Sequence, residues 1–261
     1  MKNTYSFQYQ GFPCRVDESA DGQYLDFSSD DLSLHFSVPA AGLARTTATM
    51  TAKVFFTSDL HFGHANVIKY SQRPFSSADE MDAALVRNWN DVVTARDTVY
   101  VVGDLALKRS AQLLELLRAL RGHKHLIFGN HDKALRKEPK ILELFESVQD
   151  LKTVKIQDPD ARDGVQRIVL CHFPMLVWDK SHYGAWHLHG HCHGTLPDDP
   201  HSLRLDVGVD AWETDVVRVD HEKKEVLRFR EKQYRPVEYS EVKARMSTKT
   251  WKPLDHHQDR E

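Results

Sequence analysis

Residues 54–64 read VFFTSDLHFGH, and the pattern of this stretch returns several times along the chain. An apolar run ends at Asp59, and His61 follows two residues later. In an extended backbone, residues two apart point to the same side, so the spacing predicts that both side chains hold one ligand at the end of a strand. A carboxylate beside an imidazole suits a divalent metal such as Mn, Fe or Zn. Alone, a D-x-H pair is a weak signal, since most such pairs are ordinary loops.

Later apolar runs end in the same way. The runs that finish at residues 104, 130, 172 and 191 each close on a side chain with a metal-competent oxygen or nitrogen, and His193 repeats the two-residue spacing. Ligands of open α/β sheets bind outside the carboxyl ends of the strands, so we expect these side chains to meet at one edge. Glycine precedes three of them and permits close approach by another group. The closing residues are Asp59, Asp104, Asn130, His172 and His191.

Composition limits the classes of function. With 261 residues, 41% of them hydrophobic and 28% charged, the chain has room for one large globular domain with or without a small module. A net charge of −3 provides no global basic field, which disfavours a non-specific DNA binder but not an enzyme acting on phosphate esters. Three cysteines without a C-x-x-C motif indicate a reducing cytoplasm. No apolar run suggests a signal peptide or a membrane span.

Residues 1–50 differ in pattern from the rest of the chain. Short, partly alternating runs separated by turn signals at residues 21–22 and 29–31 predict a small antiparallel β meander, and residues 40–52 predict a linker. We expect this accessory module to pack on the main domain and shield an edge. The alternative role of this module is selection of a partner or substrate. The sequence does not indicate which protein such a partner would be.

From residue 53 the pattern alternates between strand and helix, which predicts an α/β domain over residues 51–235. Ser77 and Glu80 form an S-x-x-E capping box before one helical run. Further helices are predicted over residues 110–120 and 139–147. From residue 236 the chain is polar, so residues 236–261 are predicted to be a frayed tail in which His256 and His257 are solvated.

The motifs taken together read D-x-H, G-D, G-N-H-D, a strand ending in His, and G-H-x-H. This set resembles the calcineurin-like metallophosphoesterase superfamily over residues 53–210. Residues 59–75, DLHFGHANVIKYSQRPF, are more narrowly similar to a small prokaryotic and phage-type branch of it. The resemblance implies a four-layer α/β/β/α sandwich, to which the N-terminal antiparallel β module is added. The sequence GDLALKRS lacks the D-R-G continuation of serine/threonine protein phosphatases, which disfavours that branch.

The same resemblance implies a binuclear metal centre. One divalent ion would be held by Asp59, His61 and His193, and the other by Asn130, His172 and His191, with Asp104 bridging the two. Manganese is the first candidate, with Fe, Zn or Ni as alternatives, because mixed nitrogen and oxygen sites accept several metals. Two divalent ions facing two carboxylates leave a positive surplus that suits a phosphoryl oxygen.

The implied activity is hydrolysis of phosphate esters by a metal-bridging hydroxide. Phosphodiesters are expected as substrates in preference to monoesters, and a nucleotide or a nucleic-acid end is the candidate substrate. His131 would be the general acid, and Asp132 would orient its ring. His64 and Arg73 are candidates for substrate contact, Arg73 through a bidentate grip on phosphate. A structural histidine at His64 and a loop-shaping role for Arg73 stay open.

Other polar and aromatic residues receive weaker assignments. Cys171 and Cys192 are expected to pack. The rings of Trp178, Tyr183 and Trp186 are also expected to pack, with base stacking as the alternative. His182, His187 and His189 are expected to be structural or to support the ligands, and Asp206 and Asp210 to be turn or surface groups. Alternative functions are a phosphomonoesterase, a metal-binding interaction module on the same fold, or a structural zinc protein using His191, Cys192 and His193.

Overall fold

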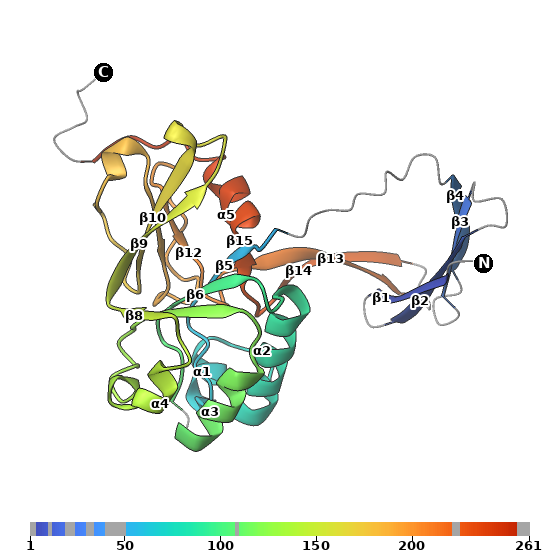
Figure 1. The fold of residues 1–261 in the computed structure, drawn as a ribbon, viewed down its shortest axis with the longest axis horizontal. Helices are drawn as coiled ribbons and strands as arrows, with labels where there is room; N and C mark the ends of the chain where they lie inside the picture. Colours follow the sequence, from blue (N-terminus) through green and yellow to red (C-terminus); the bar gives the residue numbers. More distant parts are fainter. Residues whose placement is uncertain are drawn as a thin grey trace. The chain divides into compact units, whose positions relative to one another are not determined.

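The computed structural model describes residues 4–9, 12–18, 24–29, 34–39, 51–107, 110–220 and 225–254 (Figure 1). The chain divides into two compact units, Met1–Thr51 and Ala52–Glu261. Among the described residues, no helix combines the length and the apolar character needed to cross a membrane.

The first unit is a four-stranded sheet of β1 (Thr4–Tyr9), β2 (Phe12–Glu18), β3 (Tyr24–Ser29) and β4 (Leu34–Pro39). Each strand pairs antiparallel with the next one in the chain. The predicted meander is therefore confirmed. The predicted turns and most of the predicted linker lie outside the described residues.

The second unit contains two larger sheets. The first has the order β15-β5-β6-β7-β8 and is built from β5 (Val54–Thr57), β6 (Thr98–Val102), β7 (His123–Ile127), β8 (Ser147–Gln149) and β15 (Val237–Glu238). Strands β5 to β8 are parallel, and β15 runs antiparallel to β5. Its helices are α1 (Ala65–Tyr70), α2 (Ala78–Val92), α3 (Ser110–Ala119) and α4 (Pro139–Leu142).

The second sheet has the order β12-β11-β10-β9. It is built from β9 (Leu151–Gln157), β10 (Val165–Cys171), β11 (Trp186–His189) and β12 (Arg204–Asp206). Strands β10, β11 and β12 are parallel, and β9 is antiparallel to β10. The chain then forms an antiparallel pair, β13 (Glu213–Asp220) and β14 (Glu225–Lys232), and ends its described part after α5 (Tyr239–Met246).

Neighbouring residues of the first sheet enter different cores. Phe55 and Leu126 pack with residues of α2 and α3, whereas Phe56 and Ile127 pack with residues of the second sheet such as Ile168. Side chains alternate between the faces of a strand, so helices cover one face of the first sheet and the second sheet covers the other. The predicted α/β class is confirmed, and the fourth layer of the sandwich stays a prediction.

Helix α2 begins as the sequence indicates, with one difference. The Ser77 hydroxyl accepts a hydrogen bond from the Glu80 amide at 3.1 Å. The Glu80 carboxylate, however, accepts from the Ser76 amide at 2.7 Å instead of that of Ser77. Only the serine half of the predicted capping box is present.

The prediction of a frayed tail from residue 236 is wrong for residues 237–246. β15 pairs with β5, and Val242 and Met246 of α5 are buried in the core that includes the second sheet. Asp158, after β9, accepts hydrogen bonds from Tyr239 Oη at 2.5 Å and from Lys243 Nζ at 2.6 Å. The prediction failed because a short helix can be polar in composition and still be held in place by the few apolar side chains that it buries. The predicted solvated pair at residues 256–257 lies outside the described residues.

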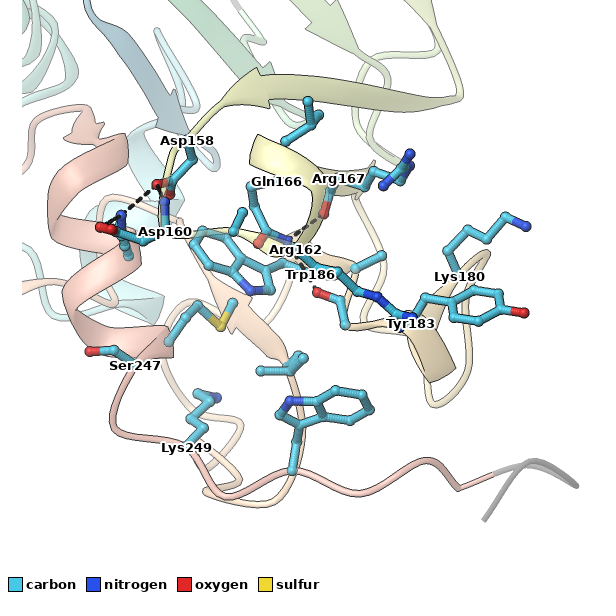
Figure 2. A pocket seen from close by; sticks show the side chains of 18 of the residues that line it. Asp158, Asp160, Arg162, Gln166, Arg167, Lys180, Tyr183, Trp186, Ser247 and Lys249 are labelled. Atoms are coloured by element: carbon cyan, nitrogen blue, oxygen red, sulfur yellow. Dashed lines mark hydrogen bonds and ion pairs between the residues drawn. The ribbon is translucent and has the colours of Figure 1, made fainter. Parts of the chain in front are cut away.

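A cavity of about 530 Å³ lies beside the second sheet, lined by Val165 at the start of β10 and Trp186 at the start of β11 (Figure 2). His172 and His191, which close two of the apolar runs, lie beyond the opposite, carboxyl ends of these two strands.

Candidate metal centre

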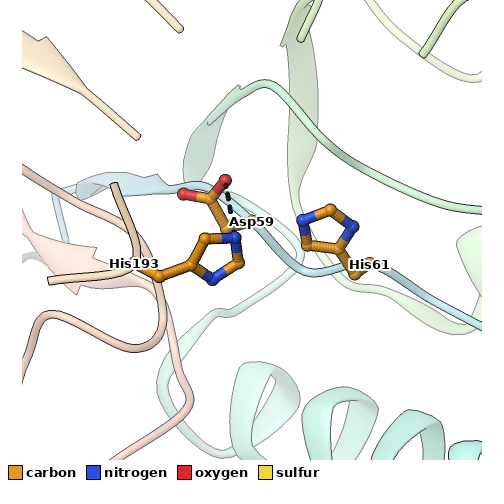
Figure 3. A group of neighbouring side chains, drawn as sticks. All are labelled: Asp59, His61 and His193. Atoms are coloured by element: carbon orange, nitrogen blue, oxygen red, sulfur yellow. Dashed lines mark ion pairs between the residues drawn. The ribbon is translucent and has the colours of Figure 1, made fainter. Parts of the chain in front are cut away.

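Polar side chains from both large sheets converge at one edge of the second unit. Asp59 and His61 follow β5, Asp104 follows β6, and His172 follows β10. Ligand atoms of Asp59, Asp104 and His172 all lie within 4.8 Å of one another, and those of Asp59, His61 and His193 form a second such group (Figure 3). Strand topology therefore brings together residues up to 134 positions apart, as expected for carboxyl ends of parallel strands. The grouping differs from the prediction, because Asp59 and not Asp104 belongs to both groups.

The backbone at this edge is not extended. The φ angles are 57° at Asp59, 53° at His61, 53° at Asp104, 69° at His191 and 48° at His193. The expectation that strand alternation aligns the first two residues is therefore wrong, since β5 ends before both. Left-handed backbone at a non-glycine residue costs on the order of 1–3 kcal/mol and persists only where the surroundings enforce it. Such clustered strain is typical of functional sites.

Backbone hydrogen bonds hold these loops together. The amide of Asp59 donates to the Gly103 carbonyl at 3.1 Å, and the amide of His61 donates to the Asp104 carbonyl at 3.0 Å. A Cβ on Gly129 would overlap the Asp104 carboxylate. Glycine at that position is therefore required by close approach, as the sequence indicates.

Asp132 stabilises the loops and does not orient His131. Its buried carboxylate accepts hydrogen bonds from the amides of Asp104, Leu105 and Gly129 at 2.8–2.9 Å. These bonds join the loop after β6 to the loop after β7, and no described hydrogen bond links Asp132 to the His131 ring. Burial raises the pKa of Asp132 against the opposing effect of these amides. The predicted contact is wrong because the carboxylate points inward.

His131 lies at the solvent side of the cluster. Its amide donates to Asp104 Oδ1 at 2.8 Å, which fixes the backbone beside the central carboxylate. Its exposed ring lies 5.3 Å from the His61 ring and 6.0 Å from the His64 ring, centroid to centroid. A group in this position can reach both the cluster and an incoming molecule.

The atoms around Asp104 fit a metal ion. Asp104 Oδ2 lies 3.6 Å from His61 Nε2 and 3.3 Å from His172 Nε2. His172 Nδ1 lies 2.9 Å from the Val102 carbonyl and donates to it, so Nε2 faces the cluster. His61 Nε2 is buried and has no hydrogen-bond partner among the described residues. An unpartnered buried nitrogen among carboxylates is costly unless it binds something, and a divalent cation satisfies it.

Asn130 gathers the other predicted ligands. Its Oδ1 lies 3.1 Å from His172 Nε2 and 3.0 Å from His191 Nδ1. Amide oxygen and imidazole nitrogen are both ligands that Mn, Fe and Zn accept. The structure thus brings together the three residues assigned to a second ion, while their roles as ligands stay a proposal.

Burial and mutual charge perturb the cluster. Burial raises the pKa of Asp59 to about 7 and lowers the pKa of His61 to about 3. Burial also opposes the charged forms of Asp104 and His172, but their mutual hydrogen bond and attraction outweigh it. The pKa of Asp104 is lowered to about 2, and that of His172 is raised to about 9. These shifts favour the ionised carboxylate of Asp104 and the protonated ring of His172.

Arg73 does not reach a substrate, and this prediction is wrong. Its side chain is fully buried, with Nη2 2.7 Å from Asp210 Oδ2 and Nε 3.0 Å from Asp210 Oδ1. It also donates to the carbonyls of Asp59 at 2.6 Å and Leu60 at 3.1 Å. The guanidinium thus braces the left-handed turn that carries Asp59.

Asp206 and Asp210 are buried, so neither is the surface group that was the alternative prediction, although Asp210 does lie in a turn. Asp210 Oδ2 accepts from His193 Nδ1 at 2.7 Å, so His193 Nε2 faces Asp59 Oδ1 at 3.9 Å. Asp206 accepts from the amide of Gly194 at 3.0 Å. Sequence reasoning missed these supports because their partners lie 12 to 137 positions away, although the place of both aspartates at or after the end of a strand run was a usable signal.

Phe173 is a site residue that sequence reasoning also missed. It is 46% exposed, and its ring centroid lies 4.8 Å from that of His191 and 5.2 Å from that of His172. An apolar residue directly after the strand-closing histidine was the available signal. The exposed ring provides an apolar wall beside the metal-competent groups.

The remaining histidines have different environments. His64 is half-buried, its Nδ1 lies 3.3 Å from His61 Nδ1, and burial lowers its pKa. His187 is buried with its two ring nitrogens near the carbonyls of Val169 and Phe173, and His189 Nδ1 lies 2.9 Å from the Gly190 carbonyl. His187 and His189 are thus structural, as expected, whereas substrate contact by His64 stays a prediction.

The weaker assignments mostly describe packing. Cys171 and Cys192 are half-buried free thiols. Trp178 donates from Nε1 to the Ala185 carbonyl at 2.9 Å, and Trp186 stacks on Tyr239. Tyr183 differs from these residues, because 54% of it is exposed.

Comparisons with known proteins agree with this geometry. The family model described as calcineurin-like phosphoesterase matches residues 52–235. The uncharacterized protein MJ1445 of Methanocaldococcus jannaschii is 36% identical over 149 residues, 56% of this chain and 73% of that protein. The gene 66 proteins of Mycobacterium phages D29 and L5 are 31% and 29% identical, over 65% and 62% of this chain and 93% and 88% of theirs.

One solved structure shares the fold. The crystal structure of AQ665, a protein of unknown function from Aquifex aeolicus, aligns with a TM-score of 0.50 at 20% sequence identity. The alignment covers 74% of this chain and 99% of that chain. At this identity the likeness bears on fold alone.

Proposed function

Because the chain belongs to the calcineurin-like phosphoesterase family, we propose that it hydrolyses phosphate esters with the help of divalent metal ions. The observation that carries the proposal is the buried Nε2 of His61, which has no described hydrogen-bond partner and lies 3.6 Å from Asp104 Oδ2. Two carboxylates and several imidazoles converge there, and a cation is the ligand such a set satisfies.

The proposed centre holds two ions. Asp104 would contact both, since its Oδ2 lies 3.6 Å from His61 Nε2 and 3.3 Å from His172 Nε2. The other ligands would be Asp59, His61 and His193 for one ion and Asn130, His172 and His191 for the other. When bound, such ions polarise a phosphoryl oxygen and lower the pKa of water. Manganese is the first candidate, and the mixed donor set also accepts Fe, Zn or Ni.

The chain's own residues provide positioning and proton transfer. Asp210 orients the His193 ring, and the Val102 carbonyl orients that of His172. His131 is exposed beside Asp104, which suits it to hold a proton for the leaving oxygen of the ester. His64 borders the same rings and could contact the phosphate.

We propose phosphodiesters as the preferred substrates, with a nucleotide or a nucleic-acid end as the candidate class. The exposed ring of Phe173 beside His191 supports an ester that carries a flat apolar group. A phosphate monoester would use the same centre without that contact. In this scheme residues 51–235 form the catalytic domain, and the N-terminal sheet is an accessory module.

The test compares hydrolysis of bis-p-nitrophenyl phosphate and p-nitrophenyl phosphate by metal-stripped protein with Mn²⁺ added back. We expect diester turnover that requires Mn²⁺ and falls by roughly 10²-fold in His131→Ala with metal content unchanged. Monoester preference would overturn the diester assignment only. If His131→Ala lost metal as well, His131 would be a ligand and not the acid. No turnover of either ester, with metal bound, would count against the enzyme and favour an interaction module.

A further inference from the structure

The cavity at the amino ends of β10 and β11 has a different chemistry from the metal centre. Its volume of about 530 Å³ lies within the range of about 300–1,000 Å³ typical of small-molecule sites. Its wall includes Arg162, Arg167 and Lys180, together with the rings of Tyr183 and Trp251. The first four of these residues also line an adjoining hollow of about 230 Å³, so they lie at the junction of the two spaces.

The three cations at this junction are available to a ligand. Among the residues that the structure describes, Arg162, Arg167 and Lys180 form no ion pair with a carboxylate. Lys243 and Lys249 line the same cavity but are occupied, Lys243 by Asp158 and Asp160 and Lys249 by Asp198 and three carbonyls. Asp163 lines the adjoining hollow and is the acid that a ligand would meet there. A chain of net charge −3 thus carries a local surplus of positive charge here.

An aromatic ring lies among these cations. The Arg162 guanidinium carbon is 5.7 Å and Lys180 Nζ is 5.3 Å from the centroid of the Tyr183 ring, more than half of which is exposed. Figure 2 shows Arg162 extending toward Tyr183, with Lys180 and Arg167 on the same side of the cavity. Cations around an exposed ring are the arrangement that binds phosphates and stacks bases.

The cavity wall also contains the side-chain amide of Gln166, a polar group suited to hydrogen bonding with a base. The Gln166 side-chain amide donates from Nε2 to the carbonyls of Arg167 at 2.8 Å and Gly184 at 3.1 Å. Its Oε1 accepts no described hydrogen bond. A fixed amide oxygen at the cavity wall is an acceptor for an exocyclic amine.

We propose that this cavity binds a nucleoside phosphate, with the phosphate on Arg162 and Arg167 and the base stacked on Tyr183. The site is separate from the metal centre, because it lies at the opposite ends of β10 and β11. It therefore does not depend on the proposed phosphoesterase activity. Ligands with a phosphate but no base, or a base but no phosphate, should bind more weakly.

Isothermal titration of the metal-stripped full-length chain tests the proposal. The probes are AMP, GMP, CMP and UMP, with ribose 5-phosphate and adenosine as partial ligands. We expect saturable binding of at least one monophosphate, weakened about tenfold or more in Arg162→Gln/Arg167→Gln. Tyr183→Ala should weaken it at least about fivefold, while Tyr183→Phe retains it. The matched control is Arg96→Gln/Arg118→Gln, which removes the same charge from exposed arginines elsewhere and should bind normally.

Specific results would overturn the proposal. Absence of saturable binding by all four monophosphates at millimolar concentration would do so. Equal affinity for ribose 5-phosphate and AMP would show that the base does not contribute to binding at this site. Binding lost in Asp104→Asn but kept in the double arginine variant would place the ligand at the metal centre instead.

Discussion

The two ends of β10 and β11 carry opposite kinds of chemistry. At the carboxyl ends, buried carboxylates and imidazoles lie around His61 Nε2, which has no hydrogen-bond partner in the described part of the chain. At the amino ends, Arg162 and Lys180 lie beside the exposed ring of Tyr183, and Arg167 lines the same cavity. The first set is suited to cations and the second to anions. The comparison shows that one sheet can present two separate sites, because its parallel strands direct different loops to each end.

The two ends also differ in how their charges are supported. The metal-competent end is braced by the buried ion pair of Arg73 and Asp210, and five of the seven candidate ligands there have left-handed backbone. Arg162, Arg167 and Lys180 at the amino ends are half-buried or exposed, and none of them forms an ion pair among the described residues. Substitutions at the first end should therefore cost activity and stability, and those at the second should cost binding alone.

The largest effect is expected for Asp104→Asn. Loss of an outer-shell partner already costs about 10- to 100-fold, so loss of a shared ligand should cost more than about 10²-fold in turnover. Metal analysis should show that both ions are bound more weakly. Asp150→Asn, at an exposed acid paired with Arg136, is the control and should keep full activity. Full activity of Asp104→Asn would contradict a shared ligand.

Arg73→Met should unfold more easily. It leaves Asp210 buried without its cation, which costs about 3–5 kcal/mol in the free energy of unfolding measured with urea. Adding Asp210→Asn should recover part of this loss. Arg136→Met, at a solvent-exposed pair, should change stability by less than about 1 kcal/mol. Equal losses of unfolding free energy in the two arginine variants would show that the buried pair stabilises the fold no more than the exposed pair does.

Asp158 is the exception at the amino ends, because it forms a buried anchor for α5. Burial raises its pKa, but the hydrogen bonds from Lys243 and Tyr239 outweigh burial, so the net shift is downward. A lowered pKa stabilises the fold above the unfolded value of about 4, and this stability is lost as the pH falls through the folded value. Asp158→Asn should cost about 1–3 kcal/mol at pH 7, and the difference from the wild type should shrink below pH 4 in urea titrations. A difference in stability that stays constant with pH would show that the charge of Asp158 does not stabilise the fold.

The smallest effect on stability is expected for Arg162→Gln/Arg167→Gln. Neither side chain has a carboxylate partner among the described residues, so the free energy of unfolding should change by less than about 0.5 kcal/mol. Hydrolysis of small p-nitrophenyl esters should be unchanged as well. A large loss of either would mean that the two ends of the sheet are coupled, which contradicts their separation.

Much of the fold and of the candidate site is predictable from residue patterns. Asp59, Asp104 and His172 each follow an apolar run, and parallel strands direct such residues to one edge. Alternation and turn signals predict the meander of the N-terminal unit. The errors concern residues whose role depends on distant partners. A pattern cannot connect Arg73 with its buried acid, Asp210, which lies 137 positions away, and adjacency in sequence wrongly pairs Asp132 with the ring of His131.

The sequence by itself determined the residue types that end each strand, and with them the α/β class and a metal-competent edge. Periodicity and ligand chemistry are local properties, so a pattern can reveal them. Only the tertiary structure decided the left-handed backbone at Asp59 and His61, the buried ion pair of Arg73 and Asp210, and the position of Arg162 and Lys180 beside Tyr183. The energy of a charge depends on its burial and on its neighbours, and folding sets both.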